Sequence, residues 1–305
     1  MTTAVPVATR MRAAVLEAPG RTTIRELAPP EPEPGQTLVR IQGCGVCASD
    51  LPVWEGRSWF VYPLEPGAPG HEGWGIDVET GQRVALVSHH AYAEFEAVPS
   101  ELVVPLPPEL DGIPFPAEPL GCALNVFSRS AVRAGRTVAV VGTGFLGLLL
   151  VQLCVGAGAR TLAFSRRESA LERARAFGAE TPADAREESC DVVIEAGGVQ
   201  ETLDLAARLV RLRGRLVIAG FHQDGPRTVD LQSWNWRGLD VVNAHERDPA
   251  VYREGMRAAV DAVVAGELDP RSLYTHVLPL ERLDEAFELV RTRPEDFVKA
   301  LVMPS

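Results

Sequence analysis

The feature that most constrains this chain is a glycine-rich turn between an apolar strand and an apolar helix. Residues 138–147 read V-A-V-V-G-T-G-F-L-G, and the following segment 148–157 is apolar and long enough for a helix. In such a unit Gly142 permits the tight turn, Gly144 lets the backbone approach a phosphate, and Gly147 lets helix and strand pack closely. A strand, a turn and a helix in this order predict a βαβ-type fold.

The same turn predicts a site for a dinucleotide pyrophosphate. The N–H groups at the start of the helix, at Phe145, Leu146 and Gly147, and the positive end of the helix dipole favour an anion. G-x-G-x-x-G by itself is a weak signal, and the alternative is a purely structural strand-to-helix turn. The apolar strand before it and the helix after it favour the cofactor interpretation.

Composition is that of an ordinary globular protein and excludes several classes of function. The chain has 305 residues, of which 46% are hydrophobic and 23% charged, and a formal net charge of −11. This length allows two domains. The acidity argues against binding to nucleic acid or to an anionic membrane, and no apolar run reaches the roughly 18 residues that cross a bilayer. Five unevenly spaced cysteines indicate reduced thiols and a cytoplasmic protein.

From residue 137 onward, strands and helices alternate. Apolar runs that read as strands occur at 137–141, 161–164, 191–194, 215–219 and 239–242. A helix is expected between the first two, and further helices over 169–177 and 200–212. Nearly continuous apolar strands that alternate with helices predict a doubly wound parallel sheet of the α/β class, with nucleotide at the carboxyl ends of the strands. Gly197 and Gly220, just past two of these strands, are expected to face it.

The end of the second strand predicts which nucleotide binds. An enzyme specific for NAD usually has an acidic residue there, which holds the ribose hydroxyls. Here Ser165 is followed by Arg166 and Arg167, and two guanidinium groups with a hydroxyl suit a phosphate dianion. The alternative is an exposed basic helix start paired with nearby glutamates. The pattern favours NADP, with NAD as the second option.

Before residue 126 the chain reads as short strands with Gly/Pro turns, which predicts an antiparallel, partly barrel-like domain. Two expected loops carry reactive side chains: 43–50 and 70–73. Cys44 and Cys47 form a C-x-x-C, which is found in redox pairs and in half of a zinc knuckle. The sequence has no second C-x-x-C, and a redox motif would precede a helix. One thiolate with His71 and a carboxylate instead suits a catalytic zinc with an open position.

Four motifs in order resemble the medium-chain dehydrogenase/reductase family, in its zinc-dependent alcohol and polyol dehydrogenase branch. They are G-C-G-V-C-A-S-D at 43–50, G-H-E-G at 70–73, A-E-P-L-G at 117–121 and V-G-T-G-F-L-G at 141–147. The resemblance extends from about residue 11 to the C-terminus. It implies a GroES-like catalytic domain formed by residues 1–125 and 270–305, and a Rossmann dinucleotide-binding domain formed by residues 126–269.

The resemblance implies one catalytic zinc, with Cys47 and His71 as ligands. In sorbitol-dehydrogenase-like members the third ligand is the Glu of an E-P-L motif. Here that residue is Glu118, which lies 24 residues before the first glycine of the turn. Cys122 is the alternative, since thiolate is the softer ligand. Glu72 is expected to lie beside the metal or to exchange onto it.

The resemblance also assigns a proton relay, and here this chain departs from the family. Ser49 matches the hydroxyl that binds the alcohol oxygen and passes on its proton, and it also suits a helix cap. Many members have a histidine three residues later, where this chain has Pro52. The relay must therefore end in ribose hydroxyls, water or another side chain. Between Glu72 and Glu118 the chain also lacks the four cysteines that hold a structural zinc in many relatives.

These features predict a zinc-dependent transfer of hydride between a secondary or polyol-type alcohol, or its ketone, and NADP. Ser49 and Glu72 are the residues expected to act in catalysis. One alternative is a zinc-free quinone or enoyl reductase on the same scaffold, and another is a non-enzymatic NADP-binding protein. The expected partners are a small alcohol or ketone and further copies of the chain, in a homodimer or a homotetramer.

Overall fold

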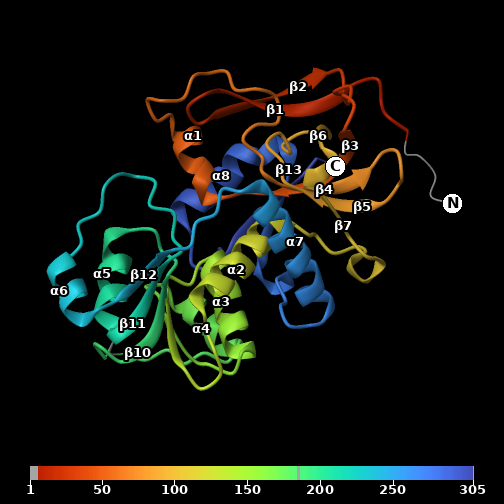
Figure 1. The fold of residues 1–305 in the computed structure, drawn as a ribbon. Helices are drawn as coiled ribbons and strands as arrows, with labels where there is room; N and C mark the ends of the chain where they lie inside the picture. The colour runs from red at the N-terminus through yellow and green to blue at the C-terminus, as the bar shows by residue number, and fades with distance from the viewer. Residues whose placement is uncertain (1–5, 184–185, 305) are drawn as a thin grey trace. The chain divides into compact units, whose positions relative to one another are not determined.

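The computed structural model describes residues 6–183 and 186–304, which form two compact units (Figure 1). The units comprise Met1–Gly121, Asp248–Val264 and Arg271–Ser305 on the one hand, and Cys122–Arg247 and Ala265–Pro270 on the other. Residues 1–5 and 305 of the expected catalytic domain lie outside the described residues. The sequence assigned 126–269 to the dinucleotide-binding part, whereas in the structure Asp248–Val264 packs within the first unit.

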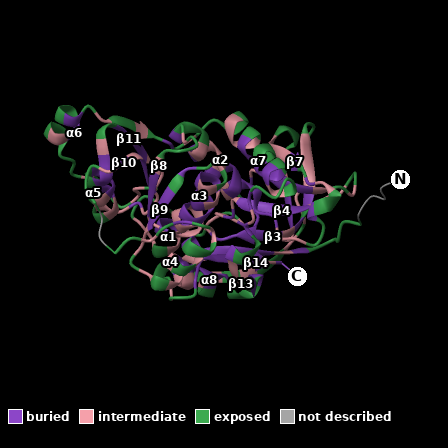
Figure 2. Cartoon of the chain, turned by 90° about the horizontal axis from the view of Figure 1, so that it is seen from below, coloured by how far each residue is buried: buried purple, intermediate pink, exposed green. Residues whose placement is uncertain are grey.

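The first unit is built on antiparallel sheets. Its strands are β1 (Met11–Ala18), β2 (Arg21–Leu27), β3 (Gln36–Gly45), β4 (Glu72–Asp77), β5 (Arg83–Leu86), β6 (Phe95–Pro99), β7 (Val103–Pro105), β13 (Tyr274–Pro279) and β14 (Lys299–Met303). β1 and β2 form a two-stranded sheet, and the larger sheet has the order β13-β14-β3-β4-β5-β7, with β6 also paired to β3. Apart from the parallel pair β13 and β14, neighbouring strands are antiparallel. β4 and β14 are mainly buried (Figure 2).

The first unit also contains helices. They are α1 (Leu51–Glu55), α7 (Pro249–Val264) and α8 (Leu283–Thr292), with the 3-10 helices η1 (Ala48–Asp50), η2 (Ser100–Leu102), η3 (Pro108–Leu110), η4 (Arg271–Leu273) and η5 (Leu280–Arg282). Helix α2 (Ala117–Ser130) begins in this unit. α7 is held to the unit by a hydrogen bond from Arg253 Nη1 to the carbonyl oxygen of Glu101, at 2.9 Å. Several α7 residues are also buried, among them Met256 and Ala259, so this late segment of the chain belongs to the first unit.

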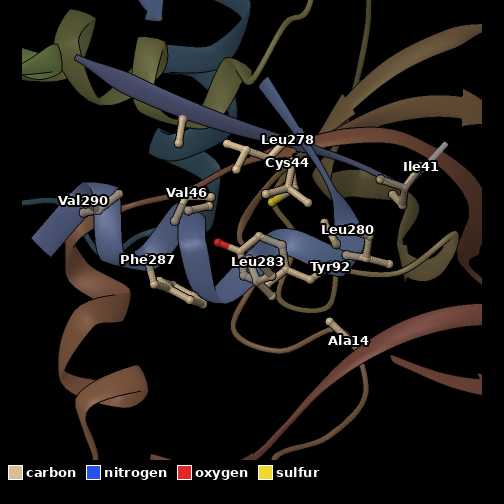
Figure 3. Close-up of a cluster of buried hydrophobic side chains, with 14 of the residues drawn as sticks. Ala14, Ile41, Cys44, Val46, Tyr92, Leu278, Leu280, Leu283, Phe287 and Val290 are labelled. Carbon is tan, nitrogen blue, oxygen red and sulfur yellow. The ribbon is translucent and has the colours of Figure 1, made fainter. Parts of the chain in front are cut away.

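A buried apolar cluster forms the core beneath α8 (Figure 3). Tyr92 and Phe287 are fully buried and meet edge to face, with ring centroids 5.9 Å apart. Cys44 and Val46, at the end of β3 and just after it, belong to the same cluster. The hydroxyl of Tyr92 lies 3.3 Å from Oδ2 of Asp50. The core therefore reaches directly to the segment that follows β3.

The expectation that residues 43–50 and 70–73 are loops is wrong at one end of each segment. Gly43–Gly45 are the last residues of β3, and Glu72 and Gly73 are the first residues of β4. The two strands pair with Gly45 opposite Glu72. A Cβ atom at Gly45 would lie 1.8 Å from Glu72 Oε2, so glycine leaves room for this carboxylate. Glycine weakens strand propensity, which is why the sequence pattern hid these strand ends.

The second unit contains one parallel sheet covered by helices, and this confirms the expected α/β class. Its strands are β8 (Thr137–Val141), β9 (Arg160–Phe164), β10 (Cys190–Glu195), β11 (Val210–Ile218) and β12 (Asp240–Asn243), in the order β12-β11-β10-β8-β9. Its helices are α3 (Phe145–Gly156), α4 (Glu168–Ala176), α5 (Gln200–Leu209) and α6 (Leu231–Arg237). Every strand pair in this sheet is parallel.

The glycine turn lies where the strand order of this sheet reverses, at the carboxyl end of β8. Gly142 has φ +97°, and a Cβ there would lie 2.7 Å from the backbone nitrogen of Gly197. A Cβ at Gly147 would lie 1.9 Å from the carbonyl oxygen of Gly142. At Gly144, by contrast, a Cβ would meet nothing within 4 Å. Two glycines are thus required by packing, whereas the third leaves an open surface.

One expected helix is too long. The structure ends α5 at Leu209, and not at residue 212, because Val210 is extended (φ −64°, ψ 127°) and pairs with Cys190 in the parallel ladder. Leu209 and Val210 are both fully buried in the core of this unit. The β-branched Val210 suits a strand, so tertiary burial overrides the helical pattern here.

The close approach of α3 to the turn after β8 can be tested by the same substitution at two glycines of α3. Gly147→Ala should lower the free energy of unfolding by about 1–3 kcal/mol, because its Cβ collides with backbone. Gly156→Ala, on an exposed position with nothing within 4 Å, should raise it by about 0.5 kcal/mol. Urea denaturation followed by circular dichroism measures both. Equal shifts in the same direction would contradict the close approach of helix and strand.

Candidate functional site

A thiol, an imidazole and a carboxyl group meet beside the β3–β4 pair. Cys47, His71 and Glu72 each offer one ligand atom, and these atoms all lie within 4.8 Å of one another. The antiparallel register explains the meeting, because Gly45 opposite Glu72 sets Cys47 and His71 on adjacent chain segments. Sulfur, nitrogen and oxygen donors in one group suit zinc, and the donor set therefore fits such an ion.

Asp50 orients the imidazole of this group. Its Oδ1 lies 3.1 Å from His71 Nδ1, and its side chain is only 5% exposed. Burial lowers the pKa of His71, but the charge and hydrogen bond of Asp50, with a contribution from Cys47, outweigh it and hold this pKa well above the usual value. Negative groups that favour a proton here also favour a cation. With Nδ1 bonded to the carboxylate, Nε2 is left for a metal.

Glu72 takes part in a buried ion pair. Its side chain is fully buried, and Lys299 Nζ lies 2.6 Å from Glu72 Oε1 and 3.0 Å from the carbonyl oxygen of Val46. Burial lowers the pKa of Lys299, but the charges of Glu72, Cys47 and Glu118 outweigh it, so the pKa is raised. Lys299 therefore stays charged and neutralises a strongly acidic region.

Ser49 contacts one metal-ligand candidate and lines a cavity with two others. Its hydroxyl donates to Cys47 Sγ at 3.2 Å, and its side chain lines the cavity together with His71 and Glu118. Ser49 is the middle residue of η1, and the N-cap positions of η1 and α1 are taken by Cys47 and Asp50, so the expectation that Ser49 caps a helix is wrong. Pro52 is buried in the first turn of α1, where the missing N–H of proline is tolerated.

The two candidates for a third ligand lie on one helix. Glu118 is in the first turn of α2, is 9% exposed and lines the cavity, and Cys122 follows one turn later and is half-buried. Within the described residues, neither is part of the group with all its donor atoms within 4.8 Å. The cavity holds about 450 Å³, within the range of small-molecule sites.

The residues expected to bind a nucleotide lie at the carboxyl edge of the parallel sheet. Gly144 precedes α3 and leaves its surroundings open, which suits an approaching phosphate. Ser165 follows β9 and accepts a hydrogen bond from the backbone of Arg167, at 3.3 Å, while Arg166 is exposed. The end of β9 thus carries a hydroxyl and basic groups, and the acidic residue that follows them, Glu168, is paired with Arg175.

A buried carboxylate, Glu195 at the end of β10, holds the neighbouring turns together. Its Oε1 accepts from the backbone nitrogens of Gly197 and Gly198, at 2.8 and 2.7 Å, and its Oε2 lies 3.0 Å from His222 Nε2. A Cβ at Gly220 would lie 2.4 Å from the nitrogen of Gly198. The turns that contain Gly197 and Gly220 are therefore tied to each other.

Sequence reasoning missed three of these supporting residues: Asp50, Glu195 and Lys299. Asp50 closes the G-C-G-V-C-A-S-D motif, and Glu195 follows a strand and precedes two glycines, so both stood at informative places. Lys299 gave no signal, because its partner Glu72 is far away along the chain.

Two models of known protein families match most of the sequence. The alcohol dehydrogenase GroES-like domain matches residues 33–108, and the zinc-binding dehydrogenase domain matches residues 146–261. The chain belongs to the zinc-type medium-chain dehydrogenase/reductase family. It is an oxidoreductase of the NAD(P)-dependent dehydrogenase class, as its sequence motifs predicted.

Individual relatives are similar along nearly the whole chain. The erythritol/L-threitol dehydrogenase of Mycolicibacterium smegmatis is 27% identical, over 97% of this chain and 98% of that protein. A protein from Sinorhizobium meliloti 1021, described as a zinc-binding dehydrogenase, was solved bound to NADP. It is 28% identical with a TM-score of 0.83, and the match covers 97% of this chain and 100% of that chain. A thermostable alcohol dehydrogenase from Pyrobaculum aerophilum, solved with cobalt and zinc, is 26% identical with a TM-score of 0.83. The match covers 97% of this chain and 100% of that chain.

In the described part of this dehydrogenase, no helix is both long and apolar enough to span a bilayer.

The buried ion pair of this dehydrogenase gives a stability test. Lys299→Met should lower the free energy of unfolding by about 3–5 kcal/mol, because it leaves the Glu72 charge buried and unpaired. The double variant Lys299→Met with Glu72→Gln should recover most of this loss. Urea denaturation at constant pH measures each variant.

An exposed ion pair is the matched control. Arg160 pairs with Glu180 at 2.7 Å on the surface, so Arg160→Met should leave the urea midpoint nearly unchanged. If Lys299→Met and Arg160→Met lowered the urea midpoint equally, the buried pair would not be the cause of the loss. A Lys299→Met, Glu72→Gln double variant no more stable than Lys299→Met would also contradict a stabilising buried pair.

Proposed function

We propose that this enzyme transfers a hydride between a secondary or polyol-type alcohol, or its ketone, and NADP, with one zinc ion per chain. The observation that carries the proposal is the meeting of Cys47, His71 and Glu72 next to the cavity that Ser49 lines. The same donor set argues against a zinc-free reductase and against a non-enzymatic nucleotide-binding protein, neither of which needs it. A bound zinc polarises an alcohol oxygen and lowers its pKa.

We assign the zinc ligands to Cys47, His71 and Glu118, with Glu72 able to exchange onto the metal. Glu118 is favoured over Cys122 because its side chain lines the cavity with His71 and its charge raises the pKa of Lys299. Glu72 stays in reach of the other donors, while its hydrogen bond from Lys299 limits its movement.

The chain's own residues position the substrate and move a proton. Ser49 Oγ accepts the proton of the alcohol hydroxyl and passes it toward water or the ribose hydroxyls, since Pro52 carries no proton. Asp50 fixes the tautomer of His71 and is itself held by Tyr92. These contacts hold the reacting groups in place before substrate arrives, which lowers the cost of reorganisation.

We assign NADP to the second unit. The glycine turn with Gly142, Gly144, Phe145, Leu146 and Gly147 receives the pyrophosphate, and the turns with Gly197 and Gly220 complete the site. Ser165, Arg166 and Arg167 receive the additional phosphate, because hydroxyl and guanidinium groups suit a dianion. The NADP in the similar S. meliloti structure supports this choice over NAD.

The proposed substrate is polar. Hydroxyl, imidazole and carboxyl groups are among the side chains that line the cavity, and the M. smegmatis relative is named for two tetritols. We also propose, from the family resemblance, a homodimer or homotetramer. Five free cysteines support a reducing cytoplasmic location.

Metal content and turnover test the proposal directly. Protein purified without chelator or added metal should contain close to one zinc per chain by elemental analysis, and it should oxidise a polyol with NADP. Cys47→Ser should lose both the metal and the activity, because it removes the thiolate ligand. Cys190→Ser, at a buried thiol of the other unit, is the control that should retain both. Zinc near zero in active wild-type protein would overturn the proposed metal chemistry.

Coenzyme preference tests the basic turn after β9. Replacing Arg166 and Arg167 together by serine should raise the KM for NADP about tenfold to a hundredfold, because charge-assisted hydrogen bonds to the phosphate are lost. The KM for NAD should change little. Arg208→Ser, at an exposed arginine on α5, is the control. An equal rise of the KM for NADP and for NAD would show that these arginines do not bind the additional phosphate.

A further inference from the structure

Two adjacent histidines form part of the wall of the cavity that contains Ser49 and His71. His89 and His90 follow β5 and line this cavity, in a stretch where the sequence has no cysteines for a second metal. The proposed mechanism uses neither imidazole. Because neither histidine has an assigned role, this turn is the part of the cavity wall that most needs an explanation.

One buried carboxylate holds the backbone of this turn. Oε1 of Glu96 accepts hydrogen bonds from the backbone nitrogens of both His89 and His90, at 2.9 and 3.0 Å. Glu96 is 4% exposed and lies on β6, where it pairs with Val39 of β3. Burial raises its pKa to about 7, although the two backbone hydrogen bonds lower it. The two hydrogen bonds to the turn partly offset the cost of burying this carboxyl group.

The turn is fixed on either side as well. Before it, Ser88 Oγ donates to the carbonyl oxygen of Gly70 and accepts from the nitrogen of Gly73, at 3.1 and 3.2 Å. After it, the nitrogen of Ala91 donates to Gly70 at 3.0 Å. His90 Nδ1 lies 3.1 Å from the carbonyl oxygen of Pro66. The turn is therefore anchored to the chain segment that carries His71.

The imidazole of His89 has no such partner. His89 is exposed, whereas His90 is half-buried. Among residues 6–183 and 186–304 the ring of His89 makes no hydrogen bond, and only its backbone nitrogen is bound. Burial, followed by repulsion from His90 and His71, lowers its pKa, which favours the neutral ring. A neutral imidazole donates one hydrogen bond and accepts another, and a hydroxyl group does the same.

We propose that His89 is a specificity-determining residue that binds a substrate hydroxyl other than the reacting one, and that Glu96 is the positioning residue that holds it. The inference rests on the proposed function and narrows it to alcohols with a second hydroxyl, such as vicinal diols and polyols. His89 and His71 line one cavity on segments tied through Gly70, so a substrate bound near His71 occupies the cavity that His89 also lines.

The test compares two four-carbon alcohols, erythritol and 2-butanol, with zinc-loaded wild-type enzyme and saturating NADP. His89→Ala should lower kcat/KM for erythritol about three- to tenfold, mainly through KM, because one hydrogen bond to substrate is lost. For 2-butanol, which has no second hydroxyl, kcat/KM should stay within about twofold. His89→Asn, whose amide also donates and accepts, should recover part of the loss.

The position of the turn is tested through Glu96. Glu96→Gln keeps an acceptor oxygen for both nitrogens and should behave like wild type, whereas Glu96→Val removes it and should reproduce the selective loss with erythritol. His276→Ala, at a half-buried histidine outside the cavity lining, is the control for His89→Ala. Thermal melts check that each variant is folded, and if Glu96→Val does not fold, the two His89 variants decide.

The outcomes separate this inference from the proposed function. A selective loss with erythritol that His89→Asn partly restores supports the inference. Unchanged kinetics, or an equal loss with both alcohols, overturns it and leaves the proposed function standing. Failure of wild-type enzyme to oxidise either alcohol with NADP or NAD would overturn the proposed function and the inference with it.

Discussion

The first unit depends on the buried ion pair between Glu72 and Lys299. It joins the start of β4 to the start of β14, although the two residues are far apart along the chain. Removing two charges from water is costly, and the pair is stable only because its geometry is close and Val46 accepts a further hydrogen bond. Gly45 must lack a side chain to admit the carboxylate. The C-terminal strand is therefore needed to complete the region that holds Cys47 and His71.

A second buried carboxylate has a comparable part in the other unit. Glu195 receives backbone hydrogen bonds from Gly197 and Gly198 and meets His222, and so it sets the turns at the carboxyl edge of the parallel sheet. In both units an acidic side chain at a strand end organises glycine-rich backbone. In both units glycine permits the close approach, and in the second unit the carboxylate also supplies the acceptor that the N–H groups of Gly197 and Gly198 require.

In the first unit, buried acidic side chains hold groups that line the cavity. Asp50, which Tyr92 contacts from the core, holds His71, while Glu96 holds the turn with His89. Each supporting group is buried and each supported imidazole faces the cavity. Buried partners keep both imidazoles in place at the cavity wall.

The sequence by itself determined the class of fold and the residue types of the site. Periodicity and the glycine turn are local, so they predicted the parallel sheet, and the motifs around Cys47 and His71 predicted the donor types. Only the tertiary structure decided what long-range contacts control: the end of α5 at Leu209, the partnership of Glu72 with Lys299, and the anchoring of His89 by Glu96. These depend on strand register and burial, which bring together residues that no spacing along the chain relates.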